Sequence, residues 1–502
     1  MTKSEQTRHG DAELTKAILA QLSQSLDASS IEPTDAAALA AQRKIRKVVR
    51  CLLSSSQAAQ SRSEQLNAHL SSLARLCDQK FVTFSYDGIP SAWRAIYIDA
   101  QLIKACCTLK AVGDSEQSAK LVRCIRDLDM ALIVAGAAST PKGQHCHDLI
   151  ACLQSNLLER EQRDAHHSDR SCFGHRSPPR KRSRLAQPEP YSPQLSESIQ
   201  ADSLIREYPF EEAPSFMDLA APDSSSRSRP FIVRAYAQKS GWPAVQSNAN
   251  EGVPGSWSST EHLLRTAGPA RVVPVEVGAN YTRKDWGQDV MLWSDFLRYC
   301  RWDEDGQHGG AIDGQNRQEA GSARPVLYMA QHDLAAQFPA LESDYMLPDY
   351  VYTSPPPPAS WPGYRPPVTP DGVITNLWIG PAGTVSPPHR DPFYNCFVQV
   401  VGYKEVWVAP PHCCPRKIAA PSGHTPAKDA VNLSSADTGS ITDSLMANTA
   451  SIDVFDAIED VPLVRSAAAK AVLGPGDLLY MPPGWWHSLR SLTRSFSVST
   501  WF

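Results

Sequence analysis

Long apolar runs are missing from this sequence of 502 residues. No stretch approaches the roughly 18 consecutive apolar residues that a membrane-spanning helix needs. The first residues also lack the apolar core of a secretory signal peptide. We therefore expect a soluble protein that has no membrane partner and is not secreted by that route.

Regularly spaced cysteines are also missing. The 12 cysteines are scattered and do not show the spacing of a small disulfide scaffold, so we expect a reducing intracellular compartment. His145 and His147 have no second ligand pair at the spacing of a zinc site, and we interpret their segment as a helix cap or loop.

The sequence has no excess of positive charge. Its net charge of −4 argues against nucleic-acid binding by the chain as a whole. Outside one short cluster we find no basic stripe, which disfavours an RNA-modifying role. Direct nucleic-acid binding is therefore not expected.

Residues 1–160 carry the pattern of helices. Leu14, Ile18, Leu22 and Leu26 recur every four residues, and later segments repeat apolar residues at three or four, as amphipathic helices do. No catalytic cluster accompanies them. The pattern predicts an all-α domain for scaffolding or partner binding.

Residues 161–203 have few apolar residues and read as a disordered basic, Pro- and Ser-rich linker. The linker contains a basic cluster at 180–184. Such a cluster is typical of nuclear localisation, but a solvated basic linker fits equally well, and both interpretations stay open. We expect a nuclear protein that could also reside in the cytoplasm.

Residues 204–502 read as a β-rich domain. Short β-branched or aromatic strands follow one another closely between Gly and Pro turns, which favours a double-sheet jelly roll. Surface insertions are expected near 303–322, 353–371 and 411–462. The predicted fold class is α+β, with the all-α domain followed by a cupin-like jelly roll.

Three residues of this domain have the chemistry of a metal site. His389 and Asp391 lie two positions apart, so an extended strand presents both on one face. His487 comes from a second β-like segment. Two His and one Asp form the facial triad of non-haem Fe(II) oxygenases. A chance His-X-Asp pair and a core histidine are the alternatives for these residues taken singly.

Nearby residues could hold a carboxylate co-substrate. Asn395 and Lys404 lie on the two strands that follow, and Lys404 suits a carboxylate as a compact charge. Ser386 and Tyr328 offer hydroxyls. Apolar walls are expected from Trp378, Phe397, Trp486 and Trp501.

The segments 273–282, 328–350, 378–391 and 473–501 carry a resemblance to a known family. They are similar to the Jumonji-C (JmjC) family of Fe(II) and 2-oxoglutarate oxygenases, in particular its lysine-specific demethylase 8 and arginyl hydroxylase subgroup. The resemblance runs from about 205 to the end of the chain.

The resemblance implies roles for individual residues. It implies that His389, Asp391 and His487 bind Fe(II), with 2-oxoglutarate and O2 as co-substrates. It implies that 2-oxoglutarate is held by Tyr328, Ser386, Asn395 and Lys404. It also implies a substrate cleft at Glu276, Tyr281 and Trp286, where a carboxylate suits a cationic side chain. Trp378 and Trp501 are expected to border the same cleft.

The implied activity is hydroxylation of a protein side chain. Arginine is favoured because the subgroup resemblance points there, and demethylation of histone N-methyl-lysine by the same chemistry is second. The implied partner is an arginine- or methyl-lysine-containing protein such as a histone or chromatin-associated protein. A cupin-like peptide-binding module without turnover is an alternative of another class, against which the intact triad and Lys404 weigh.

Overall fold

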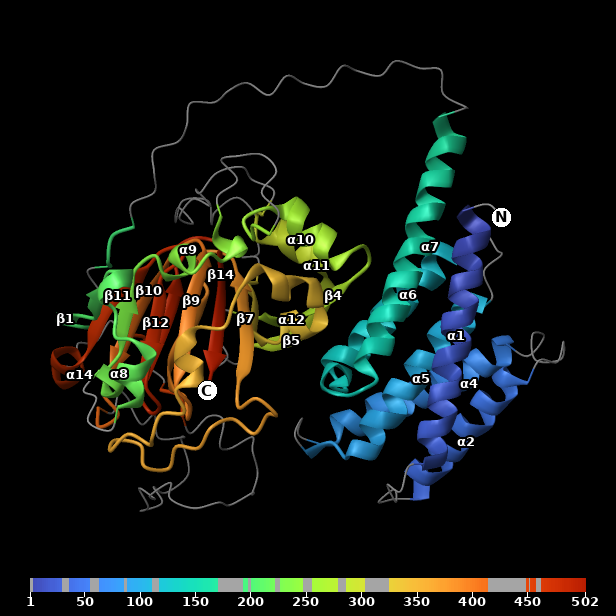
Figure 1. Ribbon diagram of the computed structural model, residues 1–502, viewed down its shortest axis with the longest axis horizontal. Helices are drawn as coiled ribbons and strands as arrows, with labels where there is room; N and C mark the ends of the chain where they lie inside the picture. The colour runs from blue at the N-terminus through green and yellow to red at the C-terminus, as the bar shows by residue number, and fades with distance from the viewer. Residues whose placement is uncertain are drawn as a thin grey trace. The chain divides into compact units, whose positions relative to one another are not determined.

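A computed structural model gives the arrangement of the chain (Figure 1). It describes residues 3–28, 36–54, 63–84, 88–110, 117–169, 193–196, 200–221, 226–246, 255–278, 286–302, 325–413, 448–450, 452–456 and 462–502. The expected insertion at 303–322, the basic cluster at 180–184 and Tyr281 lie outside these residues.

The chain divides into two compact units. One comprises Met1–Arg184 with Gly268–Val273, and the other comprises Leu185–Ala267 with Pro274–Phe502. We assigned Gly268–Val273 to the β-rich domain from the sequence, whereas the structure places it with the helices. The reason is a buried ion pair within the helical unit, in which the Arg271 guanidinium donates to both carboxylate oxygens of Asp129.

The helical unit confirms the predicted all-α domain. Its helices are α1 (Lys3–Ala28), α2 (Ala36–Leu53), α4 (Ser63–Val82), α5 (Ser91–Lys110), α6 (Gln117–Ile133), η2 (Ala137–Ser139) and α7 (Gly143–Asp169). Helix α5 is buried on most sides because α1, α2, α4, α6 and α7 all pack against it. None of the described helices is long and apolar enough to cross a membrane.

Helix α7 departs from the sequence interpretation at both ends. The segment of His145 and His147, expected as a cap or loop, lies within the first two turns of this helix. At its other end, α7 continues to Asp169, past the expected start of the linker at 161. Residues 160–169 are polar, but they include Arg, Glu and Gln, which are good helix formers and extend the helix without any apolar signal.

The second unit contains two sheets. The smaller has the strand order β1-β11-β10-β13-β8, and the larger has the order β2-β3-β12-β9-β14-β7-β6-β4-β5. The strands are β1 (Ser203–Leu204), β2 (Arg206–Tyr208), β3 (Phe231–Val233), β4 (Val272–Val277), β5 (Gly287–Leu292), β6 (Leu327–His332), β7 (Ile374–Gly380), β8 (Val385–Arg390), β9 (Asn395–Val401), β10 (Lys404–Ala409), β11 (Ala469–Leu473), β12 (Leu478–Met481), β13 (Trp486–Ser491) and β14 (Ser495–Trp501). The predicted jelly roll is confirmed.

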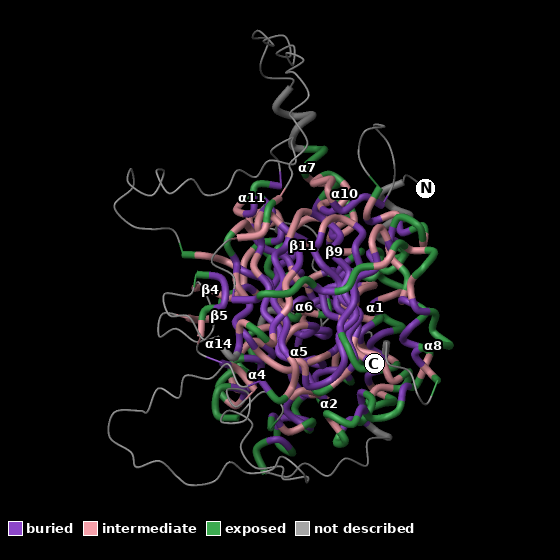
Figure 2. Tube along the Cα trace, turned by 90° about the vertical axis from the view of Figure 1, so that its left-hand side faces the viewer, coloured by how far each residue is buried: buried purple, intermediate pink, exposed green. Residues whose placement is uncertain are grey.

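Short helices complete this unit. They are η3 (Phe210–Glu212), α8 (Phe216–Ala220), η4 (Ser226–Ser228), α9 (Tyr236–Lys239), η5 (Pro243–Val245), α10 (Thr260–Ala267), α11 (Trp293–Tyr299), α12 (Leu334–Gln337), η6 (Pro339–Asp344), η7 (Asp349–Tyr352) and α14 (Pro462–Ala467). Helices α10, α11 and α12 gather at the β4–β5 end of the larger sheet (Figure 1). The strands of the sheets are largely buried, whereas many turns are exposed (Figure 2).

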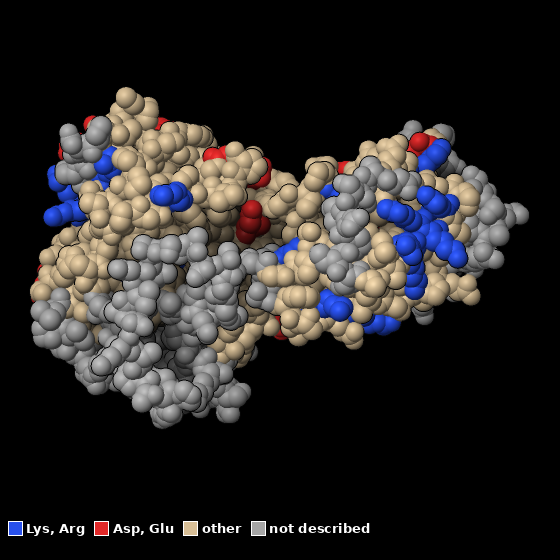
Figure 3. Space-filling model, turned by 90° about the horizontal axis from the view of Figure 1, so that it is seen from below, with Lys and Arg blue, Asp and Glu red and all other residues tan. Residues whose placement is uncertain are grey.

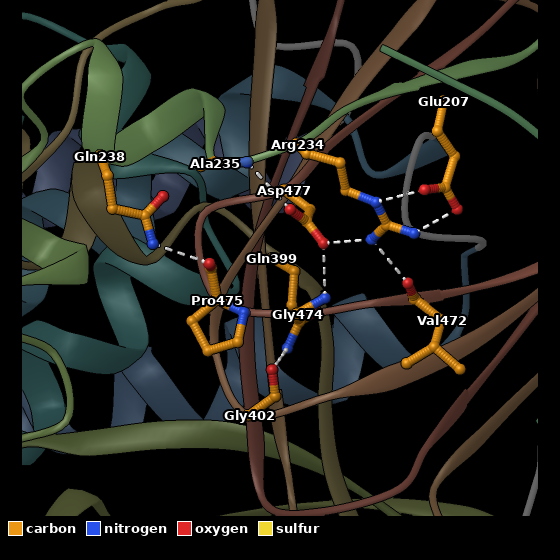
Figure 4. Close-up of polar contacts among 10 residues, drawn as sticks. All are labelled: Glu207, Arg234, Ala235, Gln238, Gln399, Gly402, Val472, Gly474, Pro475 and Asp477. Atoms are coloured by element: carbon orange, nitrogen blue, oxygen red, sulfur yellow. Dashed lines mark hydrogen bonds and ion pairs between the residues drawn. The ribbon is translucent and has the colours of Figure 1, made fainter. Parts of the chain in front are cut away.

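A polar network fixes the turn between β11 and β12 (Figure 4). Arg234 donates to Glu207, to the Val472 carbonyl at 2.8 Å and to the Asp477 carboxylate at 2.5 Å. Asp477 also accepts from the backbone N–H of Gly474 at 2.8 Å. These contacts connect the paired strands β2 and β3 to the turn between β11 and β12. Strand β12 in turn pairs with β9.

Candidate metal centre

The three predicted metal ligands come together at the β8 edge of the smaller sheet. His389 lies on β8 and His487 on β13, and the two residues face each other in the antiparallel pair of these strands. Asp391 follows directly after β8. One ligand atom from each residue lies within 4.8 Å of the others, and within the described residues this is the only such group of three.

The side chains of this group face one another. The His487 Nε2 atom is 3.4 Å from Asp391 Oδ2, and the His389 Nε2 atom is 3.9 Å from Asp391 Oδ1. The two imidazole ring centroids are 4.2 Å apart. The side chains of His389, Asp391 and His487 are only 15%, 12% and 5% exposed. Such a cluster of two nitrogen donors and one oxygen donor fits a divalent iron ion.

Backbone carbonyls set the orientation of both rings. The Nδ1 atom of His389 lies 2.8 Å from the Pro387 carbonyl oxygen, and that of His487 lies 3.1 Å from the Trp485 carbonyl oxygen. A carbonyl only accepts, so each Nδ1 carries the proton and donates. Each Nε2 therefore presents its lone pair toward Asp391, as a metal ligand requires.

The protonation states suit a cation. Burial, together with the neighbouring His487, lowers the pKa of His389 to about 4. Burial alone would raise the pKa of Asp391, but His487 and His389 outweigh it and hold that pKa below its ordinary value. Near neutral pH, His389 is thus a neutral donor and Asp391 a carboxylate, and neither must lose a proton before binding a metal.

A β-bulge brings Ser386 to the same pocket as His389. These residues are three positions apart, so a regular strand would point them to opposite faces. The pairing shifts, because His487 pairs with His389 while Leu489 pairs with Ser386. Two steps along β13, from His487 to Leu489, thus lie opposite three steps along β8, and the extra residue of β8 lies at the Pro-Pro pair 387–388. Proline has no N–H to lose there.

Lys404 is a buried cation on the wall of this pocket. Its side chain is 2% exposed, and its Nζ donates to the Tyr328 hydroxyl at 3.3 Å. The Nζ also lies 5.2 Å from the centre of the Phe397 ring. No carboxylate among the described residues pairs with it, and burial lowers its pKa to about 7. Near neutral pH the amine is thus only partly protonated, and an anionic ligand beside it would favour the charged form.

The remaining predicted co-substrate residues line the same pocket. Burial raises the pKa of Tyr328 and the Ser386 side chain opposes that rise, whereas Asn395 accepts from Ser499 at 3.0 Å. The full lining is Tyr328, Trp378, Ser386, His389, Asp391, Asn395, Phe397, Lys404, Met481, His487, Leu489 and Ser499. Sequence reasoning missed three of these, namely Met481, Leu489 and Ser499. They lie opposite or beside the predicted residues in the strand register, so a correct register would have found them.

The predicted substrate-cleft residues are only partly brought to the pocket. Glu276 pairs with Tyr328 between β4 and β6, and it accepts from the Trp286 indole at 3.3 Å. Burial raises the pKa of Glu276, and the bond from Trp286 opposes that rise. Trp378 lines the pocket, whereas Trp501 at the end of β14 is not among the lining residues.

Two tryptophans enclose Arg390, the residue between the metal ligands His389 and Asp391. The Arg390 guanidinium lies 4.6 Å from the centre of the Trp486 ring and 5.3 Å from that of Trp361. Trp361 also packs on Gly484, where an added Cβ would lie 2.4 Å from the ring. The N–H of Gly484 donates to the Asp391 carbonyl at 2.9 Å. The proline-rich segment predicted as an insertion at 353–371 thus packs against the metal-binding strand.

Comparison with known proteins identifies the family of this fold. Residues 222–502 match the cupin-like domain family. The chain is 36% identical over 263 residues to Jumonji C domain-containing protein 5 of Drosophila melanogaster, covering 52% of each chain. It is 32% identical over 263 residues to lysine-specific demethylase 8 of Xenopus tropicalis, covering 50% of this chain and 47% of the relative.

A third relative matches over a longer stretch. Lysine-specific demethylase 8 of Danio rerio is 29% identical over 320 residues, covering 62% of this chain and 63% of the relative. The chain spans about half the length of most curated relatives that it matches. The matched jelly roll and the strands that carry His389, Asp391 and His487 place this chain in the cupin-like Jumonji-C family.

Proposed function

We propose that this chain is an Fe(II)- and 2-oxoglutarate-dependent dioxygenase that hydroxylates a protein side chain. The observation that carries the proposal is the buried Lys404 ammonium in the same pocket as His389, Asp391 and His487. Three metal donors alone would fit many sites. A buried cation without a carboxylate partner beside them calls for an anionic ligand at the metal, and 2-oxoglutarate is such a ligand.

The roles of the residues follow from their positions. His389, Asp391 and His487 would hold the iron, which supplies the activation of O2. The net reaction converts 2-oxoglutarate, O2 and a C–H bond into succinate, CO2 and a C–OH group. Lys404, Tyr328 and Ser386 would bind the far carboxylate of 2-oxoglutarate, with Asn395 beside them.

The apolar lining would exclude water from this reaction. Phe397, Trp378, Met481 and Leu489 supply it. Water at the metal would compete with the substrate, and a dry pocket also strengthens the attraction between Lys404 and a carboxylate.

The substrate is proposed to be an arginine side chain of a protein. Glu276 offers a partly buried carboxylate next to Tyr328, and Trp286 orients it. A carboxylate pairs with a guanidinium through two parallel hydrogen bonds, which favours arginine. Demethylation of N-methyl-lysine is the second candidate, because two of the relatives carry the name lysine-specific demethylase 8. A histone or chromatin-associated substrate and a nuclear location belong to the same proposal.

Mass spectrometry of peptides tests the proposal. The protein is incubated in air with Fe(II), 2-oxoglutarate and peptides that contain arginine or N-methyl-lysine, and succinate is measured in parallel. A gain of one oxygen on the arginine peptide supports the hydroxylase, and the loss of one methyl group supports the demethylase.

Two variants serve as controls. His389→Ala removes a metal donor, and Glu276→Gln keeps the metal centre but removes the proposed charge for the substrate. We expect no product with the first. With the second we expect a raised KM for the arginine peptide. If succinate formation with every peptide equals that of His389→Ala, a peptide-binding module without turnover replaces the enzyme as the better interpretation.

A further inference from the structure

Helix α2 carries a strongly basic face that the metal centre does not explain. Its 18 residues include Arg43, Lys44, Arg46, Lys47 and Arg50, and they include no acidic residue. Figure 3 shows Lys and Arg side chains gathered on the helical unit, on the side where Figure 1 places α2. The expectation that no basic stripe lies outside the linker is therefore wrong.

The fold fixes these charges on one side of the helix. The opposite side is apolar and buried through Ala38, Ala41, Ile45, Val48 and Val49. Four of the basic residues are exposed, and we call them the α2 basic face: Arg43, Lys44, Lys47 and Arg50. Arg46 is different, because it is half-buried and donates to the Leu26 carbonyl at the end of α1.

The spacing of the α2 basic face works against helix stability. Lys47 lies four residues after Arg43, three after Lys44 and three before Arg50, and like charges at these spacings repel. Arg50 in the last turn gains from the helix dipole, but Arg43 and Lys44 in the middle do not. Within the part of the chain that the structure describes, Arg43, Lys44 and Lys47 form no ion pair that would relieve the repulsion.

We infer that the α2 basic face binds the phosphate backbone of a double-helical nucleic acid. A protein partner normally needs aromatic or apolar anchors at the centre of the interface. Single-stranded nucleic acid normally needs aromatic side chains on which its bases stack. Helix α2 has no aromatic residue, and its one exposed large apolar side chain, Leu39, is 36% exposed. The exposed side of the helix therefore offers mainly charge and hydrogen-bond donors. Regular phosphates of a duplex match that chemistry, and arginine suits them in particular.

The overall charge of the protein makes this contact local. A chain with net charge −4 has no general attraction for nucleic acid. Only a concentrated patch can overcome that balance, and α2 concentrates five cations within 18 residues. DNA and RNA duplexes both present a regular phosphate backbone to such a patch, and the experiment below distinguishes between them.

Salt-dependent binding of the full chain tests the inference. Fluorescence anisotropy is measured with a labelled mixed-sequence DNA duplex, the matching RNA duplex and the single strand, between about 50 and 200 mM salt. The variant combines Arg43→Gln, Lys44→Gln and Lys47→Gln. Each lost phosphate contact reduces the slope of log K against log salt by about 0.9, so three should reduce it by about 2.7. Wild-type affinity then falls about 40-fold further than that of the variant across this range.

A matched variant on another helix controls for total charge. Lys120, Arg123 and Arg126 are exposed on α6, and changing all three to Gln removes the same charge from the same unit. We expect this triple variant to keep the wild-type slope. Thermal denaturation should show no loss of stability in the α2 variant, since glutamine is a good helix former and the repulsion is removed.

The basic cluster at 180–184 could bind nucleic acid by itself, so the measurements are repeated with its basic residues changed to Ser. The inference holds if the α2 substitutions reduce the slope in this background too. The inference is overturned if duplex binding is lost when the 180–184 cluster alone is changed, or if the α6 variant reduces the salt slope as much as the α2 variant does. A higher affinity for the single strand than for the duplex would also overturn it. So would competition by poly-glutamate as strong as that by the unlabelled duplex, because this would indicate an acidic protein partner.

Discussion

Replacing Lys404 with methionine should raise the stability of the protein and weaken 2-oxoglutarate binding at the same time. Methionine keeps most of the length and apolar surface of the side chain and removes the charge. Lys404 is 2% exposed, and its amine donates a hydrogen bond to the Tyr328 hydroxyl at 3.3 Å. Most substitutions that damage a buried binding site also destabilise the protein. A variant that is more stable but binds the ligand more weakly therefore makes this test specific.

The gain in stability follows from the pKa. Burial lowers the pKa of Lys404 from 10.5 to about 7. Between these values the unfolded chain binds more protons than the folded one, so wild-type stability should rise with pH across that window. At pH 7 the unfavourable contribution is on the order of 4 kcal/mol. Lys404→Met removes it, so we expect a higher unfolding temperature at pH 7 without ligand, with a difference that shrinks toward pH 10.

The loss in ligand affinity follows from the missing charge. Hydrogen bonds to charged groups contribute about 1.5 to 3 kcal/mol, which corresponds to roughly a 10- to 150-fold increase in Kd for 2-oxoglutarate. Wild-type binding should also weaken as the pH rises above 7, because the lysine must then take up a proton. The methionine variant should lack this pH dependence. Lys404→Ala should lower co-substrate affinity in the same direction and leave metal affinity unchanged.

Anaerobic calorimetric titration of 2-oxoglutarate into the Fe(II)-loaded protein measures the affinity, and thermal denaturation measures the stability. Lys470→Met is the control, because Lys470 is a half-buried lysine on β11, the strand next to β10 in the same sheet. A Lys404→Met protein that unfolds at a lower temperature and binds 2-oxoglutarate like the wild type would refute the reasoning, since Lys404 would then be an ordinary core residue.

Three further predictions concern other parts of the chain. Asp129→Asn should destabilise the helical unit by about 3 to 5 kcal/mol in urea unfolding, because it leaves the buried Arg271 guanidinium without its partner. Asp127→Asn on the same helix should cost less than about 1 kcal/mol, because its pair with Lys104 is partly exposed; equal effects would contradict the argument. Trp361→Ala should weaken metal binding about 2- to 30-fold in a titration, because the Trp361 ring holds Arg390, which lies between the metal ligands His389 and Asp391. Trp361→Phe keeps an aromatic ring and should bind metal nearly as the wild type does. Deleting 180–184 should move a fluorescent fusion out of the nucleus, and unchanged nuclear fluorescence would favour a merely solvated linker.

The sequence was sufficient for the parts of the fold that depend on local periodicity. The four-residue repeat of apolar residues from Leu14 to Leu26 predicted a helix, which is α1, and the all-α unit is confirmed. The spacing of His389 and Asp391 predicted that both would face one side, and the structure brings them together with His487. Period-two alternation is a property of any extended strand, so this inference needed no knowledge of the tertiary structure.

Features that depend on tertiary contacts were not predictable in this way. Arg271 lies next to a predicted strand, and no local pattern shows that it would form an ion pair with Asp129 of the distant helix α6. The α2 basic face is a different case, because a local pattern contains it. At 3.6 residues per turn the basic residues fall on one side of the helix, and Ile45, Val48 and Val49 fall on the other, where they are buried.

The bulge in β8 determines which side chains of this strand face the pocket. The sequence suggested Ser386 as a hydroxyl donor, although its three-residue distance from His389 contradicts a regular strand. The structure resolves the conflict through the extra residue at 387–388, where two prolines cannot complete the ladder. Without the bulge, either the histidine or the serine would face away from Lys404. The same irregularity therefore puts a metal donor and a hydroxyl, neighbours of the buried cation, on one wall, and a pattern of alternating residues cannot reveal it.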